Sequence, residues 1–186
     1  MKKNIILLIL LSLLAVGCQN NNFNNDANKP NDAASEQNSQ SKKIESQNKK
    51  EIAPDFELES LDGTKIKLSD LKGKNVIINF WATWCGFCVA EMPDLQKLQD
   101  TYKDNDLIVL AVNVGESKEV AKKFMEENKL NLMVLLDKDS AVSNRYGLSS
   151  FPSTIAINKK GEVVTGYIGM MTYEKMEKLY GFFEKE

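Results

Sequence analysis

The fold of this chain is decided by the stretch Asn75-Val-Ile-Ile-Asn-Phe-Trp-Ala-Thr-Trp-Cys85-Gly-Phe-Cys88. Its apolar first half is typical of a central strand that is covered on both faces of a sheet. Beyond Cys85, apolar residues recur at helical spacing as far as Tyr102, which predicts an amphipathic helix. The two cysteines therefore stand at a strand-to-helix junction, where both sulfur atoms come within bonding reach.

The start of a helix is a favourable place for a reactive thiol. The unpaired N–H groups and the partial positive charge of a helix N-terminus stabilise a thiolate at Cys85 and lower its pKa. We expect Cys88, one turn inside the helix, to be shielded and to break the mixed disulfide that forms on Cys85. The spacing therefore predicts a redox pair with Cys85 as the nucleophile and Cys88 as the resolving thiol.

Strand and helix patterns alternate along the rest of the domain. We expect strands at 56–58, 65–68, 74–80, 107–114 and 132–136, followed by a hairpin of 153–158 with 162–165. We expect helices after Cys85, after a Ser117 cap, from an Asp139 cap to Gly147, and over 172–183 with Met176, Leu179, Tyr180 and Phe183 inward. This order predicts an α/β fold with a mixed central sheet and helices on both faces.

Length and composition indicate one globular domain with an extension. The chain has 186 residues, of which 42% are apolar and 27% charged, as in ordinary soluble proteins. The 24 basic residues are balanced by 26 acidic ones, so we expect no nucleic-acid binding through phosphate charge. Histidine is absent, which excludes Ser-His-Asp and Cys-His nucleophile systems and histidine-liganded zinc or copper sites.

The N-terminus has the pattern of an export signal. Lys2 and Lys3 precede an apolar run over 5–16, which is typical of a signal peptide and short for a membrane span. The run ends in Ala15-Val16-Gly17-Cys18, which resembles the lipobox of bacterial lipoproteins, although the pattern prefers leucine at the position of Ala15. We therefore predict a signal peptide over 1–17 and a lipid on Cys18. The alternative is an ordinary signal peptide with a chance cysteine.

A polar tether is expected to separate the lipid from the domain. Residues 19–50 are dominated by Asn, Gln, Ser and Lys, with Phe23 and Ile44 as the large apolar side chains. Such a stretch buries too little apolar surface to offset its ordering entropy, so we predict disorder. The predicted domain organisation is thus a lipidated tether over 18–50 and a globular domain over 51–186.

Three other uses of the cysteine pair remain open on the residues alone. A structural zinc site would need carboxylates as its further ligands, since Cys18 is the one other cysteine. A copper(I) carrier could use the two thiolates without a histidine. A purely structural disulfide is compatible with export, although such a short loop stabilises little. We expect no metal at the pair.

The segment from Asn79 to Pro93 resembles the active-site region of the TlpA/ResA group of membrane-anchored thioredoxin-like proteins. The likeness extends from about Ala53-Pro54-Asp55-Phe56 to the C-terminal helix. The resemblance implies a thioredoxin fold with an additional N-terminal β-hairpin. It also implies thiol–disulfide exchange outside the cytoplasm, with Cys85 and Cys88 as the redox-active pair and no cofactor besides their disulfide.

The resemblance carries further positions across. Pro93 matches a proline that bends the active-site helix, and Phe151-Pro152-Ser153 falls where the family has a cis-proline loop. In this fold that loop faces the cysteines, and the backbone of Phe151 can pair with a bound peptide as an added strand. We therefore expect Phe151, Pro152 and Trp84 to contact the substrate.

Glu91 matches a glutamate that is thought to tune the thiol pKa values and proton transfer in the ResA-like group. It follows Cys88 by three residues, so the two share a helix face. Burial and a nearby thiolate would raise the pKa of this carboxyl and suit it to accept the Cys88 proton; the alternative is a solvated helix glutamate. Asn79 stands where thioredoxin has a buried aspartate and cannot accept a proton.

The leading hypothesis is a lipid-anchored reductase of the bacterial cell membrane that acts outside the cytoplasm. It would take electrons from a membrane thiol donor of the CcdA/DsbD type and pass them to exported proteins that contain disulfides. The Gly86-Phe87 dipeptide differs from that of thioredoxin and of the ResA-like group, so the potential stays open and a disulfide-forming oxidase is the alternative. A metal-carrier lipoprotein is a second alternative, and a peroxidase is disfavoured because Arg145 lies away from the cysteines in the sequence.

Overall fold

The computed structural model describes residues 51–185. The predicted signal peptide, Cys18 and the tether lie outside these residues. The domain is built on a seven-stranded sheet with the order β2-β1-β5-β4-β3-β6-β7. Its strands are β1 (Glu57–Ser60), β2 (Lys65–Lys67), β3 (Asn75–Trp81), β4 (Leu107–Val114), β5 (Met133–Asp137), β6 (Ser153–Ile157) and β7 (Val163–Ile168).

The sheet is mixed, as predicted. Strands β3, β4 and β5 run parallel to one another, whereas β6 pairs antiparallel with both β3 and β7. The β1–β2 hairpin joins the other side of the sheet by antiparallel pairing with β5. This is a thioredoxin-like fold with the additional N-terminal hairpin that the family resemblance implied.

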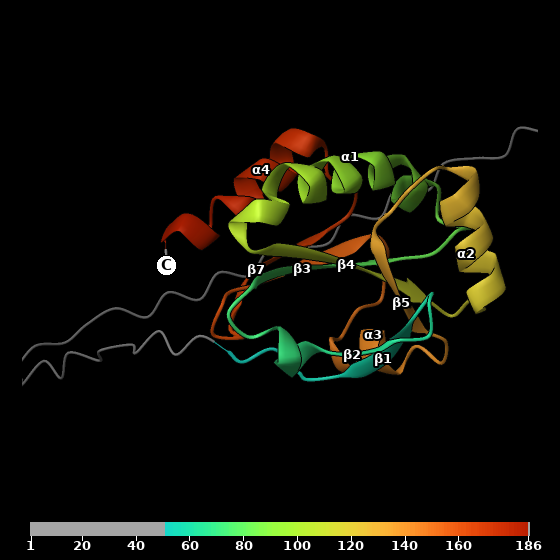
Figure 1. The fold of residues 1–186 in the computed structure, drawn as a ribbon, viewed down its shortest axis with the longest axis horizontal. Helices are drawn as coiled ribbons and strands as arrows, with labels where there is room; N and C mark the ends of the chain where they lie inside the picture. Colours follow the sequence, from blue (N-terminus) through green and yellow to red (C-terminus); the bar gives the residue numbers. More distant parts are fainter. Residues whose placement is uncertain (1–50, 186) are drawn as a thin grey trace, which may run out of the picture. The chain divides into compact units, whose positions relative to one another are not determined.

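Helices cover both faces of the sheet (Figure 1). They are α1 (Gly86–Tyr102), α2 (Lys118–Glu127), α3 (Ala141–Arg145) and α4 (Tyr173–Tyr180). Three short 3-10 turns are η1 (Leu68–Leu71) between β2 and β3, η2 (Lys103–Asn105) after α1, and η3 (Phe183–Lys185) after α4. None of the helices within 51–185 has the length and apolar character needed to cross a membrane.

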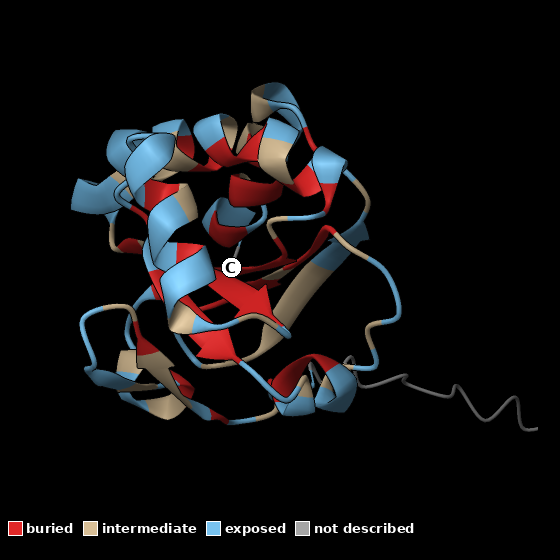
Figure 2. Cartoon of the chain, turned by 90° about the vertical axis from the view of Figure 1, so that its right-hand side faces the viewer, coloured by how far each residue is buried: buried red, intermediate tan, exposed pale blue. Residues whose placement is uncertain are grey.

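Strand β3 divides the core into two apolar clusters. All seven of its residues are buried, and the strands at the middle of the sheet are buried as well (Figure 2). Ile77 and Trp81 belong to the cluster shared with α1 and α4, whereas Val76, Ile78 and Phe80 belong to the cluster on the opposite face. The alternation follows from the period of two along a strand. Packing on both faces holds β3 in place, and therefore also positions the start of α1, which follows β3 after a short turn.

Two helices end earlier than the sequence predicts. Helix α3 ends at Arg145 rather than Gly147. The last helix ends at Tyr180 rather than Phe183, because the chain passes through Gly181 into the separate turn η3. Met176, Leu179, Tyr180 and Phe183 are nevertheless all buried, as predicted.

The cap of α3 also differs. Ser140 precedes the helix in the left-handed region, with φ 60°. The buried Asp137 carboxylate accepts hydrogen bonds from the N–H groups of Val142, at 3.0 Å, and Ser143, at 2.8 Å. The predicted Asp139 accepts one bond from Ala141, at 3.2 Å. The predicted strand ends at residue 136, whereas β5 includes Asp137; sequence reasoning chose Asp139 as the cap and missed Asp137.

Candidate active site

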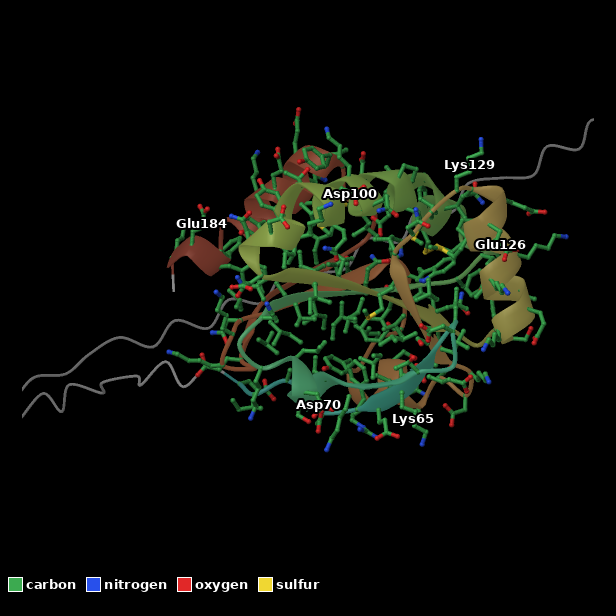
Figure 3. All side chains as sticks on the ribbon, in the orientation of Figure 1. Lys65, Asp70, Asp100, Glu126, Lys129 and Glu184 are labelled. Carbon is green, nitrogen blue, oxygen red and sulfur yellow. A yellow bond between two sulfur atoms is a disulfide. The ribbon has the colours of Figure 1, made fainter. Side chains whose placement is uncertain are left out.

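The two cysteines form a disulfide at the junction of β3 and α1 (Figure 3). Their Cα atoms are 5.2 Å apart, and Cys85 is the N-cap residue of α1. The Cys85 sulfur accepts a hydrogen bond from the Cys88 N–H at 3.2 Å. The first turn of α1 contains no acidic residue, so nothing there offsets the positive end of the helix, which favours a thiolate at Cys85.

Both cysteines have low accessibility in the disulfide form. Cys85 is 8% exposed, because it belongs to the apolar cluster between β3 and α1, against which Phe151 packs. Cys88 is 0% exposed. The order of accessibility agrees with the predicted roles, whereas the roles themselves stay predictions.

The loop before β6 faces the same junction. The Phe151–Pro152 peptide bond is cis, as predicted. The carbonyl oxygen of Pro152 accepts a hydrogen bond from Gly169 N–H at 2.8 Å, which ties the loop to the end of β7. The rings of Trp84 and Phe151 meet edge to face, with centroids 6.3 Å apart. The structure thus brings Trp84 and Phe151 together beside the disulfide.

Exposed aromatic side chains surround the disulfide. Trp84 is 70% exposed and Phe87 is 69% exposed. Sequence reasoning treated Phe87 as a departure from related dipeptides and did not consider it a contact residue. Its position in the first turn of α1, between two cysteines, is the signal that could have identified it.

An open pocket of about 320 Å³ lies next to Trp84 and Phe151. Charged side chains are absent from its lining, which consists of Trp84, Val114, Gly115, Ser140, Ser143, Asn144, Leu148, Ser149 and Phe151. Neither cysteine lines the pocket, but Trp84, the residue directly before Cys85, does. An uncharged pocket at this position suits the apolar or neutral side chains that flank a cysteine in a partner peptide.

Glu91 is buried beneath the site. It is 1% exposed, which contradicts the alternative of a solvated helix glutamate. Its Oε1 accepts a hydrogen bond from the Asn79 amide at 2.7 Å, and its Oε2 accepts one from Met171 N–H at 2.8 Å. Burial raises the pKa of Glu91 to about 7, with a further increase from Asp94, while these two hydrogen bonds act in the opposite direction. The group is therefore poised to exchange a proton near neutral pH.

Asn79 has a role that the sequence did not reveal. Its side-chain amide is 0% exposed and donates both to Glu91 and to the hydroxyl of Thr154, the latter at 3.0 Å. A polar residue inside an apolar strand must find hydrogen-bond partners, and this was the available signal. Asn79, which stands where thioredoxin has a buried aspartate, thus holds the carboxyl of Glu91 in place.

Helix α1 continues through Pro93, and the bend at this proline stays a prediction.

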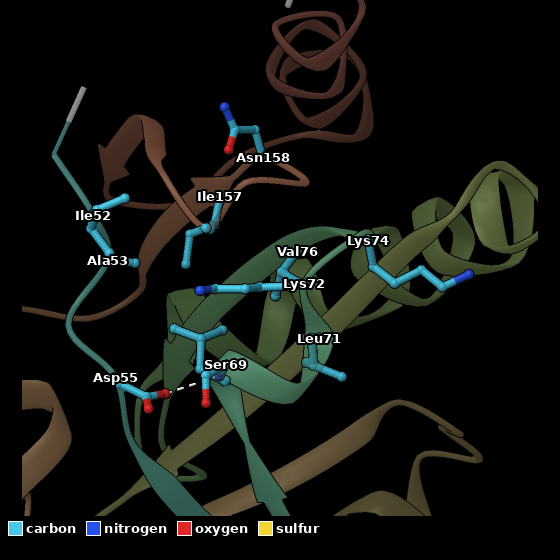
Figure 4. A pocket seen from close by; sticks show the side chains of 12 residues that line it. Ile52, Ala53, Asp55, Ser69, Leu71, Lys72, Lys74, Val76, Ile157 and Asn158 are labelled. Atoms are coloured by element: carbon cyan, nitrogen blue, oxygen red, sulfur yellow. Dashed lines mark hydrogen bonds between the residues drawn. The ribbon is translucent and has the colours of Figure 1, made fainter. Parts of the chain in front are cut away.

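Two further features lie outside this group. A pocket of about 170 Å³ opens at the other end of β3, between Ile52, η1 and the β6–β7 turn, and contains neither cysteine (Figure 4). Arg145 in α3 donates a hydrogen bond to the carbonyl oxygen of Asp55, a contact that gives no support to a peroxidase site.

Comparison with known proteins agrees with this geometry. Residues 50–165 match the AhpC/TSA family. Thiol-disulfide oxidoreductase ResA from Geobacillus kaustophilus (strain HTA426) is 43% identical over 126 residues, which cover 68% of this chain and 72% of that protein. The chain belongs to the AhpC/TSA family as a ResA-like member. It is accordingly a protein-disulfide oxidoreductase.

Solved structures of similar proteins share the fold of this ResA-like domain. StoA from Bacillus subtilis is 26% identical with a TM-score of 0.61, and the match covers 69% of this chain and 98% of that one. The exposed lipoprotein thioredoxin Etrx1 from Streptococcus pneumoniae strain TIGR4 is 34% identical with a TM-score of 0.59, again over 69% of this chain and 98% of that one.

Proposed function

We propose that this oxidoreductase is a lipid-anchored reductase that acts outside the cytoplasm on disulfides of exported proteins. The observation that carries the proposal is the disulfide at the N-terminus of α1 with the buried carboxyl of Glu91 one helical turn beyond Cys88. This arrangement supplies an attacking thiolate, a resolving thiol and a proton acceptor, and the chain has no histidine that could take the last role.

The proposed reaction begins with the reduced pair. The Cys85 thiolate attacks one sulfur of the client disulfide, forms a mixed disulfide and releases the first client thiolate. Glu91 accepts the proton of Cys88, and the resulting thiolate attacks the Cys85 sulfur and releases the second client thiolate. The client gains two electrons and the Cys85–Cys88 pair loses two. A membrane thiol donor of the CcdA/DsbD type then returns two electrons to the pair.

The client is proposed to bind across the exposed aromatic residues and the cis-proline loop. Trp84 and Phe151 offer an apolar contact beside Cys85. The backbone of Phe151, directly before β6, is placed to pair with an extended segment of the client. No metal or organic cofactor enters the proposed reaction, since the disulfide itself carries the electrons.

Anchoring is proposed from the N-terminal sequence. Cleavage before Cys18 would leave this cysteine as the lipidated N-terminus, with 18–50 as a tether. The similar Streptococcus pneumoniae protein is described as an exposed lipoprotein, which supports this proposal. Cys18→Ala should release the protein from bacterial membranes while the domain retains its reductase activity. Retention on the membrane after removal of the signal would place the anchor elsewhere.

Client trapping tests the reaction. Cys88→Ser stops the reaction at the mixed disulfide, so the variant should capture exported proteins as adducts on Cys85 that dithiothreitol releases. Cys85→Ser is the matched control and should capture none. Disulfide reduction of insulin by wild type, measured by turbidity, should be lost in both variants. Full insulin reduction by Cys85→Ser would refute the assignment of the nucleophile.

A further inference from the structure

Glu116 lies between the end of β4 and the start of α2, and its carboxylate holds the segment that leads to Cys85. Its Oε2 accepts hydrogen bonds from Thr83 N–H, at 2.8 Å, and from the Asn113 side-chain amide, at 2.7 Å. Its Oε1 accepts one from the Thr83 hydroxyl. Asn113 is 0% exposed at the end of β4, so the carboxylate joins the reactive segment to a fixed point in the sheet.

The segment held in this way presents the residues that meet the client. Thr83 lies in a turn that is closed by a hydrogen bond from Cys85 N–H to the Ala82 carbonyl oxygen, at 3.2 Å. Trp84, the next residue, directs its exposed ring toward Phe151. Fixing Thr83 therefore fixes the backbone from which both Trp84 and Cys85 project.

Glu116 also connects two walls of the pocket that Trp84 and Phe151 line. Val114 and Gly115, directly before Glu116, line one part of the pocket, and Trp84, directly after Thr83, lines another. The hydrogen bonds from Thr83 to Glu116 cross from one part to the other. Their loss would allow the Trp84 wall to move relative to the end of β4.

We propose that Glu116 is a positioning residue that sets the shape of the client pocket and the direction of Cys85. This inference rests on the proposed function, because it assigns the pocket to the client. Glu116 takes no part in proton or electron transfer. Its effect is to hold Trp84 and Cys85 where a client disulfide is attacked.

Geometry and charge can be separated at this position. An amide in place of the carboxylate can accept both N–H donors with its oxygen and donate its own N–H to the Thr83 hydroxyl, because a hydroxyl accepts as well as donates. Glu116→Gln therefore retains all three contacts without the charge. Glu116→Ala removes all three.

The test compares these variants in two measurements. We expect Glu116→Ala to slow reduction of insulin by about 10-fold, since small misplacements of reacting groups cost rate steeply, and Glu116→Gln to recover most of that loss. Hydrogen exchange at the Thr83 amide, followed by NMR, should accelerate at least 10-fold in the alanine variant and stay near wild type in the glutamine variant. Glu119→Ala, at an exposed glutamate in the first turn of α2, is the matched control and should change neither measurement.

Each outcome decides the proposal. Equal slowing of insulin reduction in the alanine and glutamine variants would mean that the charge of Glu116 matters rather than its hydrogen bonds. Unchanged insulin reduction in the alanine variant would mean that the hydrogen bonds of Glu116 do not affect the reaction. Either result would overturn the proposal. Thr83→Val removes only the hydrogen bond from the Thr83 hydroxyl and should give a rate of insulin reduction between those of wild type and Glu116→Ala. This variant replaces Glu116→Ala in the test if Glu116→Ala does not fold. If wild type fails to reduce insulin, the proposed function fails, whereas exchange at Thr83 still reports whether Glu116 holds the segment.

Discussion

At the scale of single residues, the two cysteines differ in surroundings although they share a disulfide. Cys85 caps the helix and retains 8% exposure, whereas Cys88 is 0% exposed one turn inside. In the reduced protein, Cys85 should therefore be alkylated first. Brief treatment with iodoacetamide, followed by mass spectrometry of the peptides, measures this order. Faster labelling of Cys88 would exchange the two assigned roles.

Glu91 is the residue whose chemistry depends most on burial. Its pKa of about 7 leaves it partly ionised at neutral pH, so it can accept a proton there. Glu91→Gln should slow disulfide exchange about 10–100-fold near pH 7, at or below the lower end of the roughly 100–10,000-fold that general acid–base catalysis usually contributes. The difference should shrink at high pH, where the Cys88 thiol ionises without help. Exchange rates from about pH 5 to 9 measure it.

The fold should tolerate this substitution. The Oδ1 atom of Asn79 has no hydrogen-bond partner among the described residues, so the Asn79 amide can turn over and accept from the new amide. Glu126→Gln, at an exposed position of α2, is the matched control. Superimposable profiles for wild type and Glu91→Gln would leave water as the proton acceptor.

At the scale of elements, α3 depends on a carboxylate from the strand before it. Asp137 is 0% exposed and accepts two backbone N–H groups of the helix. Asp137→Ala should lower the free energy of unfolding by about 1–2 kcal/mol, because a lost cap leaves helical N–H groups unpaired. Asp139→Ala is the control and should cost less, since Asp139 is exposed and accepts one bond. Urea unfolding compares them, and an equal cost would restore Asp139 as the cap.

The elements also show what the sequence could and could not predict. The strand-to-helix junction at Cys85 and the alternation along β3 follow from apolar periodicity, which is a local property. Other contacts join segments that are distant in sequence, such as Met171 with Glu91 and Thr83 with Glu116. The family resemblance, together with the helical spacing from Cys88, therefore made Glu91 a candidate, while its burial, which raises its pKa, required the packed structure.

At the scale of the whole molecule, the raised pKa of Glu91 links stability to pH. The folded protein holds the Glu91 proton up to about pH 7, whereas an unperturbed glutamate has a pKa of 4.5. The folded state therefore binds more protons between these values, and its stability falls as the pH rises from about 4.5 to 7, by up to about 3 kcal/mol. Urea unfolding of the oxidised protein should show this loss. Glu91→Gln should lack it, and equal slopes in both proteins would refute the link.

The direction of electron flow is a property of the whole molecule as well. The comparisons establish a protein-disulfide oxidoreductase, and the central proposal is that it works as a reductase. The two directions differ in the relative stability of the dithiol and disulfide states, which the reduction potential measures.

The most direct test is therefore the equilibrium reduction potential of the Cys85–Cys88 pair in the purified protein, titrated against dithiothreitol or glutathione buffers. A reductase should have a potential near or below about −250 mV, close to that of thioredoxin. A potential near about −120 mV, as in a strong oxidant, would contradict the account and assign the protein to disulfide formation.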